Sequence, residues 1–244
     1  MSQSLDLLFL GSGNAFAAGR YWGSFLLNGR YLFDASPIAL PHMKRSEVDV
    51  AEIEAIFISH FHADHFFGLP FLLLEYDEAT QRSKALTIIG PPGIEERLRT
   101  ITDAGYPHLL AKEKSYEERY LDLRDGLEGD IGELHYLARS VEHVEGLDCF
   151  GFRVEIGGRT LAYSGDSTLC DPLVELAEGA DVFVVECSCW GDACGPHLGP
   201  QDIRELRRRL GPTPTFILTH LAAGQPDLGI ENVLLADDLA RFSL

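Results

Sequence analysis

The residues best suited to chemistry crowd into one short stretch, ISHFHADHFFGLP, residues 58 to 70. It carries His60, His62, Asp64 and His65 within six positions, although the whole chain of 244 residues has only nine histidines. Imidazole and carboxylate groups together suit zinc, and also manganese or iron. The alternative, four unrelated surface residues, is disfavoured by this density of ligand types. The stretch therefore predicts a metal site.

The position of the stretch explains how its side chains could share a pocket. The apolar run AIFI predicts a buried strand, and the polar residues begin where this run ends. An extended or turning chain lets His60 and His62 point into one pocket. Asp64 and His65 follow at the predicted start of a helix, where adjacent side chains diverge. This second pair can therefore serve a neighbouring position.

Three further candidates also follow predicted strands. His143 comes after LHYLARSV, Asp166 after LAYSG and His220 after FILT. A lone histidine after a strand is more often structural than a ligand. Three such residues in a chain that already has a dense cluster favour a shared metal site.

The elements that must position these residues are short strands and helices separated by turn signals. Hairpin turns are predicted at LLNGRYLF and EIGGRTLAY, because Asn-Gly and Gly-Gly supply positive φ angles. Strands are predicted at residues 5–10, 24–27, 31–34, 55–59, 86–89, 118–123, 132–141, 150–156, 160–164, 181–186 and 215–219. Helices are predicted after Asp64 and at residues 94–104, 171–178, 199–210 and 230–242. The pattern predicts one α/β domain over residues 1–244, a four-layer sandwich of two sheets with helices outside.

The charge balance limits the partners. The chain has 20 Lys and Arg against 38 Asp and Glu, a net charge of −18. Such a chain lacks the clustered positive charge that long nucleic acid or an anionic membrane would require. No apolar run approaches the ~20 residues of a membrane span. The start of the chain, MSQSLDLLFL, lacks the basic flank and cleavage site of a signal peptide.

The cysteines point to a reducing compartment. Their number is five, which is odd, in a chain large enough not to need disulfides. Together with the missing export signal, this predicts a cytoplasmic protein with free thiols. Cys187, Cys189 and Cys194 are spaced C-x-C-x4-C, which is not a standard zinc spacing, so a cysteine metal site is not predicted.

Several short motifs occur in a fixed order: FLGSGNA, FDASP, SHFHADHFFGL, EHVEG, YSGDS, VVEC, HLGP and LTHL. On these motifs the chain resembles the metallo-β-lactamase-fold hydrolases, and within them the ribonuclease Z-like phosphodiesterase branch. The resemblance implies an αββα sandwich and two divalent metal ions, zinc first, with manganese or iron as alternatives. It implies that one metal is held by His60, His62 and His143, the other by Asp64, His65 and His220, and that both share Asp166.

The same resemblance assigns supporting roles. Asp34, which closes YLFD, is similar to the family's buried aspartate behind the metals and is expected to orient a ligand or bind the backbone. His197 is similar to a histidine that faces the scissile phosphate and assists the leaving group; a capping or packing role is its alternative. Glu186 either orients a neighbour or binds a loop. GSGNA, residues 11–15, is either an anion-binding turn or only a tight turn.

Two departures from that branch concern the substrate. The chain shows no long insertion rich in glycine and basic residues, such as the arm with which tRNA-processing members grip tRNA. The segment after His220, LAAGQPDLG, also lacks their serine and arginine. With the negative charge, these departures favour a small phosphodiester or nucleotide substrate and make long nucleic acid a poor fit.

The predicted function is a dinuclear metal-dependent hydrolase, a phosphodiesterase that uses a metal-bridging hydroxide, with Asp64 and His197 as catalytic residues. The alternatives are an ester, thioester or lactone hydrolase on the same fold, a tRNA 3′-processing endonuclease, and a binding or sensor domain. The apolar segment FFGLPFLLLEY could contribute to a homodimer interface, although a core helix is the favoured interpretation.

Overall fold

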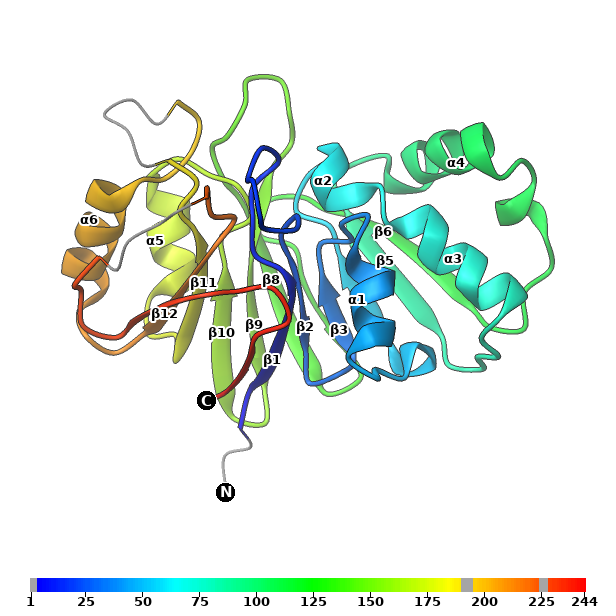
Figure 1. Cartoon of the computed structure of the whole chain (residues 1–244), viewed down its shortest axis with the longest axis horizontal. Coiled ribbons are helices and arrows are strands. Elements are labelled where there is room, and N and C mark those ends of the chain that lie inside the picture. The colour runs from blue at the N-terminus through cyan, green and yellow to red at the C-terminus, as the bar shows by residue number, and fades with distance from the viewer. Residues whose placement is uncertain (1–3, 190–194, 224–227) are drawn as a thin grey trace.

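The computed structural model describes residues 4–189, 195–223 and 228–244, and it contains two seven-stranded sheets (Figure 1). The first sheet has the strand order β14-β1-β2-β3-β4-β5-β6. Its strands are β1 Asp6–Gly11, β2 Ser24–Leu27, β3 Tyr31–Phe33, β4 Ala55–Phe57, β5 Leu86–Gly90, β6 Glu118–Asp122 and β14 Arg241–Ser243. The second sheet has the order β13-β12-β11-β10-β9-β8-β7. Its strands are β7 Glu128–Ile131, β8 Leu134–Ser140, β9 Phe150–Ile156, β10 Arg159–Tyr163, β11 Val182–Glu186, β12 Thr215–Thr219 and β13 Val233–Leu235.

Helices cover the outer face of each sheet, as Figure 1 shows. The first sheet carries α1 Ala39–Arg45, α2 Ala63–Phe66, α3 Leu69–Glu78 and α4 Ile94–Gly105. The second sheet carries α5 Asp171–Ala177 and α6 Pro200–Leu210. Short 3-10 helices lie at Val50–Glu52 and Leu109–Ala111. The predicted four-layer sandwich of two sheets with helices outside is confirmed.

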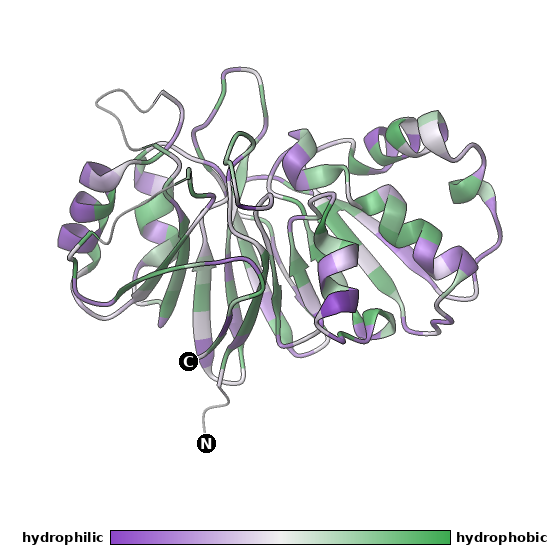
Figure 2. Ribbon diagram, viewed as in Figure 1, coloured by the Kyte–Doolittle hydropathy of each residue, from purple (hydrophilic) through white to green (hydrophobic). Residues whose placement is uncertain are grey.

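Alternation along the strands assigns side chains to separate cores. On β4, Phe57 belongs to the core between the two sheets, whereas its neighbour Ile56 belongs to the core beneath the helices. Successive side chains of a strand point to opposite faces, so a strand buried on both faces reads as an unbroken apolar run. A third core lies between the second sheet and α5 and α6. Figure 2 shows the resulting green strands and the purple segments of α1 and α6.

A row of aromatic rings holds the central core in register. Phe25, Phe33 and Phe57, on neighbouring strands, stack with ring centroids 4.7 Å and 4.9 Å apart. Phe152 and Tyr163 of the opposite sheet meet Phe33 edge-on at 6.1 Å and 5.9 Å. Aromatic pairs of this geometry stabilise by about 0.5–1.5 kcal/mol beyond area burial. The two sheets are thus fixed against each other directly below the strand ends that carry the site.

The predicted helix at residues 230–242 is wrong. This segment instead contributes one edge strand to each sheet: β13 pairs parallel with β12, and β14 pairs antiparallel with β1. The apolar residues have a spacing that also fits a helix, but the unpaired edges of both sheets offer backbone hydrogen bonds that outweigh this local preference. Asn232 and Leu239 take left-handed conformations, with φ of 56° and 63°, which break any continuous helix.

The segment FFGLPFLLLEY forms a core helix, as favoured from the sequence. Leu69, Leu72, Leu73 and Tyr76 of α3 are buried against the first sheet, whereas Phe71 remains 44% exposed. Sequence patterns missed α1 and the edge strand β7. None of the helices in the described part of the chain is long and apolar enough to cross a membrane.

Candidate metal centre and active site

The candidate site lies where parallel strands of both sheets end. In the first sheet β3 and β4 run parallel, and in the second β10, β11 and β12 run parallel. Asp34 directly follows β3 and His60 lies just beyond β4. Asp166 lies just beyond β10, Glu186 ends β11, and His220 directly follows β12. Because carboxyl ends of parallel strands gather at one edge of a sheet, the fold brings these polar residues together.

Two of these residues leave their strands through a left-handed backbone. Asp34 and His220 both have φ of 54°. This conformation costs a residue with a side chain roughly 1–2 kcal/mol, and it persists only where the surrounding structure holds it. Strain of this kind is concentrated at functional sites, and here it turns two polar side chains toward one centre.

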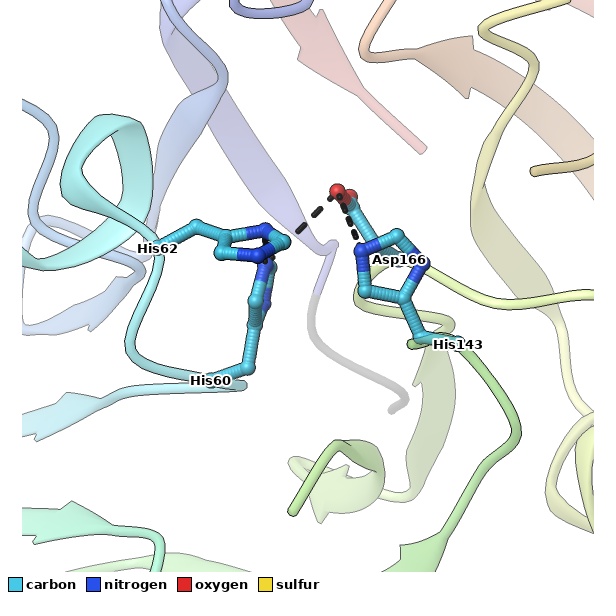
Figure 3. A group of neighbouring side chains, drawn as sticks. All are labelled: His60, His62, His143 and Asp166. Carbon is cyan, nitrogen blue, oxygen red and sulfur yellow. Dashed lines mark hydrogen bonds and ion pairs between the residues drawn. The ribbon is translucent and has the colours of Figure 1, made fainter. Parts of the chain in front are cut away.

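The structure brings all seven predicted ligands into two adjoining groups. Each residue offers one ligand atom, and within each group these atoms lie within 4.8 Å of one another. One group consists of His60, His62, His143 and Asp166, and the other of Asp64, His65 and His220. Figure 3 shows the four side chains of the first group converging on one point.

Asp166 lies between the two groups. Its Oδ2 atom is 3.7 Å from His60 Nε2, 3.9 Å from His143 Nε2, 3.5 Å from His65 Nε2 and 3.4 Å from His220 Nε2. The carboxylate therefore faces imidazoles from both groups. This is the position expected of a ligand shared between two cations.

The donor atoms fit divalent cations. His143 Nε2 and Asp166 Oδ1 are buried without a hydrogen-bond partner, and His65 Nε2 faces His220 Nε2 at 3.3 Å. A buried polar atom without a partner costs about 1–3 kcal/mol. A cation bound among these atoms would remove this cost, and imidazole with carboxylate is a donor set that divalent transition metals accept.

Hydrogen bonds behind the centre fix the direction of three imidazoles. His65 Nδ1 lies 2.8 Å from Asp34 Oδ2, His143 Nδ1 lies 2.8 Å from the Pro196 carbonyl oxygen, and His60 Nδ1 lies 3.0 Å from Ser59 Oγ. In each case the Nδ1–H donates outward, which leaves the Nε2 lone pair directed into the centre. Metal-ligating histidines are commonly held in this way.

Asp34 organises this support. Its carboxylate accepts hydrogen bonds from the Ser59 backbone N–H at 2.7 Å, the Ser59 hydroxyl at 2.9 Å and the Tyr163 hydroxyl at 2.6 Å, in addition to His65. The residue is fully buried. From the sequence, Asp34 is expected to orient a ligand or to bind the backbone, and in the structure Asp34 does both. Sequence reasoning missed Ser59 and Tyr163, whose side chains carry no motif of their own.

Burial and neighbouring charges set the protonation of the centre. Burial lowers the pKa of His60 well below its usual value, which favours the neutral form that donates a lone pair. Burial alone would raise the pKa of Asp166, but His220 and His65 hold it well below its ordinary range. Burial opposes protonation of His65, yet Asp166 and Asp34 raise its pKa well above normal. The carboxylates of Asp166 and Asp34 therefore favour positive charge in the centre of the site.

Glu186 and His197 form a pair beside the two groups of candidate metal ligands. His197 Nδ1 lies 2.9 Å from Glu186 Oε1, and a ring nitrogen of His197 lies within 4.8 Å of ligand atoms of Asp166 and His220. Glu186 also accepts hydrogen bonds from the backbone N–H groups of Ser167 at 2.9 Å and Ser188 at 3.1 Å. Glu186 therefore combines both roles considered for it: it orients a neighbour and it binds a loop.

Charge within this pair favours a protonated imidazole. Burial would lower the pKa of His197, but the hydrogen bond and charge of Glu186 raise it above the usual histidine value. Burial raises the pKa of Glu186, and His197 opposes that shift. His197 remains partly exposed, at 26% of its side chain, whereas Glu186 is buried. The imidazolium can thus reach a ligand while its counter-ion stays fixed behind it.

His197 and four of the seven candidate ligands line one cavity of about 470 Å³. Its walls consist of Asn14, Ala15, Phe16, His62, Ala63, Asp64, Asp166, Ser188, Cys189, His197 and His220. A volume of this size lies in the range of small-ligand sites. Sequence reasoning named Asn14 only as part of GSGNA and did not single out Phe16 or Ser188, although all three line the cavity.

The loop that supplies Asn14 and Phe16 folds back on residues 20–22. A Cβ atom at Gly11 would lie 2.0 Å from the Trp22 carbonyl oxygen, so this close approach requires glycine. The Gly13 N–H donates to the Tyr21 carbonyl and the Asn14 N–H to the Leu221 carbonyl. Since these amides are already paired within the protein, the tight-turn interpretation of GSGNA holds and the anion-binding one is not supported.

Among the described residues, no cluster with metal-ligand geometry includes a cysteine. Cys149 and Cys170 are free and buried, whereas Cys189 is disulfide-bonded, so the expectation of free thiols is wrong for Cys189. Cys194 lies outside the described residues.

Comparison with known proteins agrees with this site. Residues 29–221 match the model of the beta-lactamase superfamily domain, which covers most of the chain. The chain therefore belongs to the beta-lactamase superfamily, whose fold implies binding of divalent metal.

Its relatives include ribonuclease Z of Methanosarcina mazei, with 26% identity over 98% of each chain. Human tRNase Z, short form, has a TM-score of 0.78 and 26% identity over 98% of both chains. A diphosphatase from the PhnP family also has a TM-score of 0.78, but its identity is 18%, so this likeness concerns the fold alone. The alignment with the Methanosarcina protein extends over 309 positions, more than the 244 residues of this chain, so the relative contains insertions absent here.

Proposed function

We propose that this chain is a metal-dependent phosphodiesterase that acts on a small phosphodiester or nucleotide. The observation that carries this proposal is His197, held by the buried Glu186 and placed within 4.8 Å of Asp166 and His220 at the cavity wall. A fixed imidazolium beside a metal centre suits a reaction in which negative charge and a leaving oxygen must be stabilised.

Two divalent cations, zinc in the first instance, are proposed for the centre. His60, His62 and His143 would hold one, Asp64, His65 and His220 the other, and Asp166 both, as the two groups and the central carboxylate support. Bound there, the cations supply Lewis acidity and lower the pKa of water to near neutrality. Asp34 and Ser59 hold the imidazoles in place, and the Asp166 carboxylate offsets part of the cationic charge.

His197 is proposed to act on the leaving group. Its Nδ1–H is engaged by Glu186, so its other nitrogen is the one available to a ligand in the cavity. The hydrogen bond and charge of Glu186 raise the pKa of His197 against the effect of burial, which favours a proton on that nitrogen. His197 can donate this proton to the oxygen that departs from phosphorus, or bind a non-bridging phosphoryl oxygen. A positioned acid of this kind contributes about 10²–10⁴-fold to a rate.

The size of the cavity and the charge of the chain support a small substrate. The cavity is about 470 Å³, and the net charge is −18. Neutralising phosphates along a tRNA needs clustered Lys and Arg, which such a balance opposes. The insertions of the Methanosarcina relative are absent here. A cytoplasmic location is part of the same proposal.

A tRNA 3′-processing endonuclease is the second candidate. The names of the ribonuclease Z and tRNase Z relatives, which match over nearly their whole length, favour it. Cleavage of a precursor tRNA at rates above those on small diesters would establish it instead.

The experiment is a substrate panel with metal-loaded protein. Bis-p-nitrophenyl phosphate, cyclic nucleotides and dinucleotides are compared with p-nitrophenyl acetate, a lactone and a thioester. Hydrolysis of the phosphodiesters, reduced about 10²-fold or more in His197→Ala with metal content retained, is the expected result. Activity confined to the carboxylic substrates would instead assign an ester, thioester or lactone hydrolase.

A further inference from the structure

Phe16 is a part of the cavity wall that the metal centre and His197 leave unexplained. Its side chain is 94% exposed, although phenylalanine is among the residues most often found buried. It lines the same cavity as Asp166, His197 and His220. In Figure 1 the dark blue loop after β1 reaches the edge of the molecule where α2 and the loop after β8 also lie. An apolar ring held in water at this place contributes little to the core.

Hydrogen bonds connect the backbone of Phe16 to the residue that orients His197. Glu186 Oε2 accepts from the Ser188 N–H at 3.1 Å, and Ser188 Oγ accepts from Asn14 Nδ2 at 2.9 Å. Asn14 Oδ1 in turn accepts from the Phe16 N–H at 3.0 Å. The glutamate that orients His197 is therefore connected to the backbone of Phe16 by three successive hydrogen bonds.

The neighbouring turn adds to this support. Trp22 Nε1 donates to the Ala15 carbonyl at 3.4 Å, and the Ala17 N–H donates to the Asn14 carbonyl at 3.2 Å. The backbone on both sides of Phe16 is thus tied down, while the ring itself stays open to solvent. A loop whose backbone is already ordered loses less entropy when a ligand covers it.

We propose that Phe16 is a stacking platform for the base of a nucleotide substrate whose phosphodiester lies at the metal centre. The inference rests on the proposed function and specifies its substrate class. A neutral aromatic face beside an anion-binding centre matches a ligand with a flat ring at one end and a phosphate at the other. Stacking accepts any base because every base has a π face.

The described wall around Phe16 predicts weak discrimination among bases. The Asn14 amide is engaged by the Phe16 N–H and by Ser188, and Ala15 has no polar side chain. Direct reading of a base requires paired donors and acceptors aimed at its edge. Adenine, guanine, cytosine and uracil nucleotides are therefore expected to bind within about tenfold of one another, in the order of their stacking strength.

Calorimetric titration of zinc-loaded protein tests the platform without relying on turnover. Adenosine 5′-monophosphate and ribose 5-phosphate share the phosphate and sugar, and only the first carries a base. Wild-type protein is expected to bind the nucleotide about five- to a hundredfold more tightly. Phe16→Ala should remove this preference and leave ribose 5-phosphate unchanged. Phe16→Trp should retain it, and Phe16→Leu, apolar but not aromatic, should lose most of it.

Phe71→Ala is the matched control, since Phe71 is an exposed phenylalanine on α3 that does not line the cavity. It should bind both ligands as the wild type does. Two results would overturn the stacking role of Phe16: equal affinity of the wild type for the two ligands, or unchanged nucleotide binding in Phe16→Ala. If ribose 5-phosphate still binds in that case, the proposed function is unaffected. If neither ligand binds and no phosphodiester is hydrolysed, the platform fails together with the proposed function.

Discussion

Replacement of Glu186 by alanine separates two tasks that this buried carboxylate performs. The side chain accepts hydrogen bonds from the backbone N–H groups of Ser167 and Ser188, and from His197. Without it, the buried Ser167 N–H and the partly buried Ser188 N–H lose their partner, at up to about 1–3 kcal/mol each. Removing a buried carboxylate from a water-excluded site returns part of this cost. The expected net loss in unfolding free energy is about 2–4 kcal/mol, measured by urea denaturation.

The same variant should lower kcat on a phosphodiester, because His197 loses both its orientation and the charge that holds its proton. The expected loss is about ten- to a hundredfold, below the about 10²–10⁴-fold limit for removing a positioned acid altogether. Glu155→Ala, an exposed glutamate on β9, serves as the control and should leave stability and kcat near wild type.

A double-mutant cycle decides whether Glu186 acts through His197. If it does, Glu186→Ala combined with His197→Ala has a kcat no lower than His197→Ala alone, because residues in one network are not additive. Losses that multiply across the two variants would refute the coupling. So would a Glu186→Ala protein that keeps full activity while His197→Ala loses it.

Other parts of the molecule give equally definite expectations. Asp34→Asn should weaken zinc binding by about 10- to 100-fold, since support behind ligands has this effect; competition with a chromophoric chelator measures it, and wild-type affinity would argue against the role. Phe57→Ala should cost about 3–5 kcal/mol of unfolding free energy, because the ring is wholly buried between the sheets; a loss below 1 kcal/mol in urea titration would be inconsistent with that packing. Gly11→Ala should displace the loop, since the new Cβ would lie 2.0 Å from the Trp22 carbonyl oxygen; a crystal structure with an unmoved loop would contradict this. Removal of metal by a chelator should lower Tm, and zinc at 100 times its Kd should raise the unfolding free energy by about 2.7 kcal/mol. Calorimetry measures both effects, and a Tm that does not change with chelator would argue against metal binding.

The strands of the fold and the location of the site could be predicted from local patterns. AIFI ends at Ile58, and the histidines begin two residues later, so the chemistry is visible at a strand end. Side chains of β4 alternate between its two faces, so Ile56 and Phe57 belong to different cores. Only a strand covered on both sides needs apolar residues at every position. Such signals are local, and a single sequence contains them.

The features of the fold and the site that could not be predicted from the sequence depend on contacts between distant segments. Residues 233–235 and 241–243 have no strand signal of their own and are strands because β12 and β1 offer unpaired edges. Asn14 joins the site through Ser188, a partner 174 positions away. The exposure of Phe16 is equally invisible in GSGNAF, because a phenylalanine there reads as one more apolar residue.

The proposed function depends most directly on two cations at the edge where both sheets meet. Metal analysis of zinc-loaded protein after gel filtration measures this without any substrate. Two zinc ions per chain are predicted from the two groups of ligands around Asp166. One ion or none per folded chain would contradict the two-metal centre.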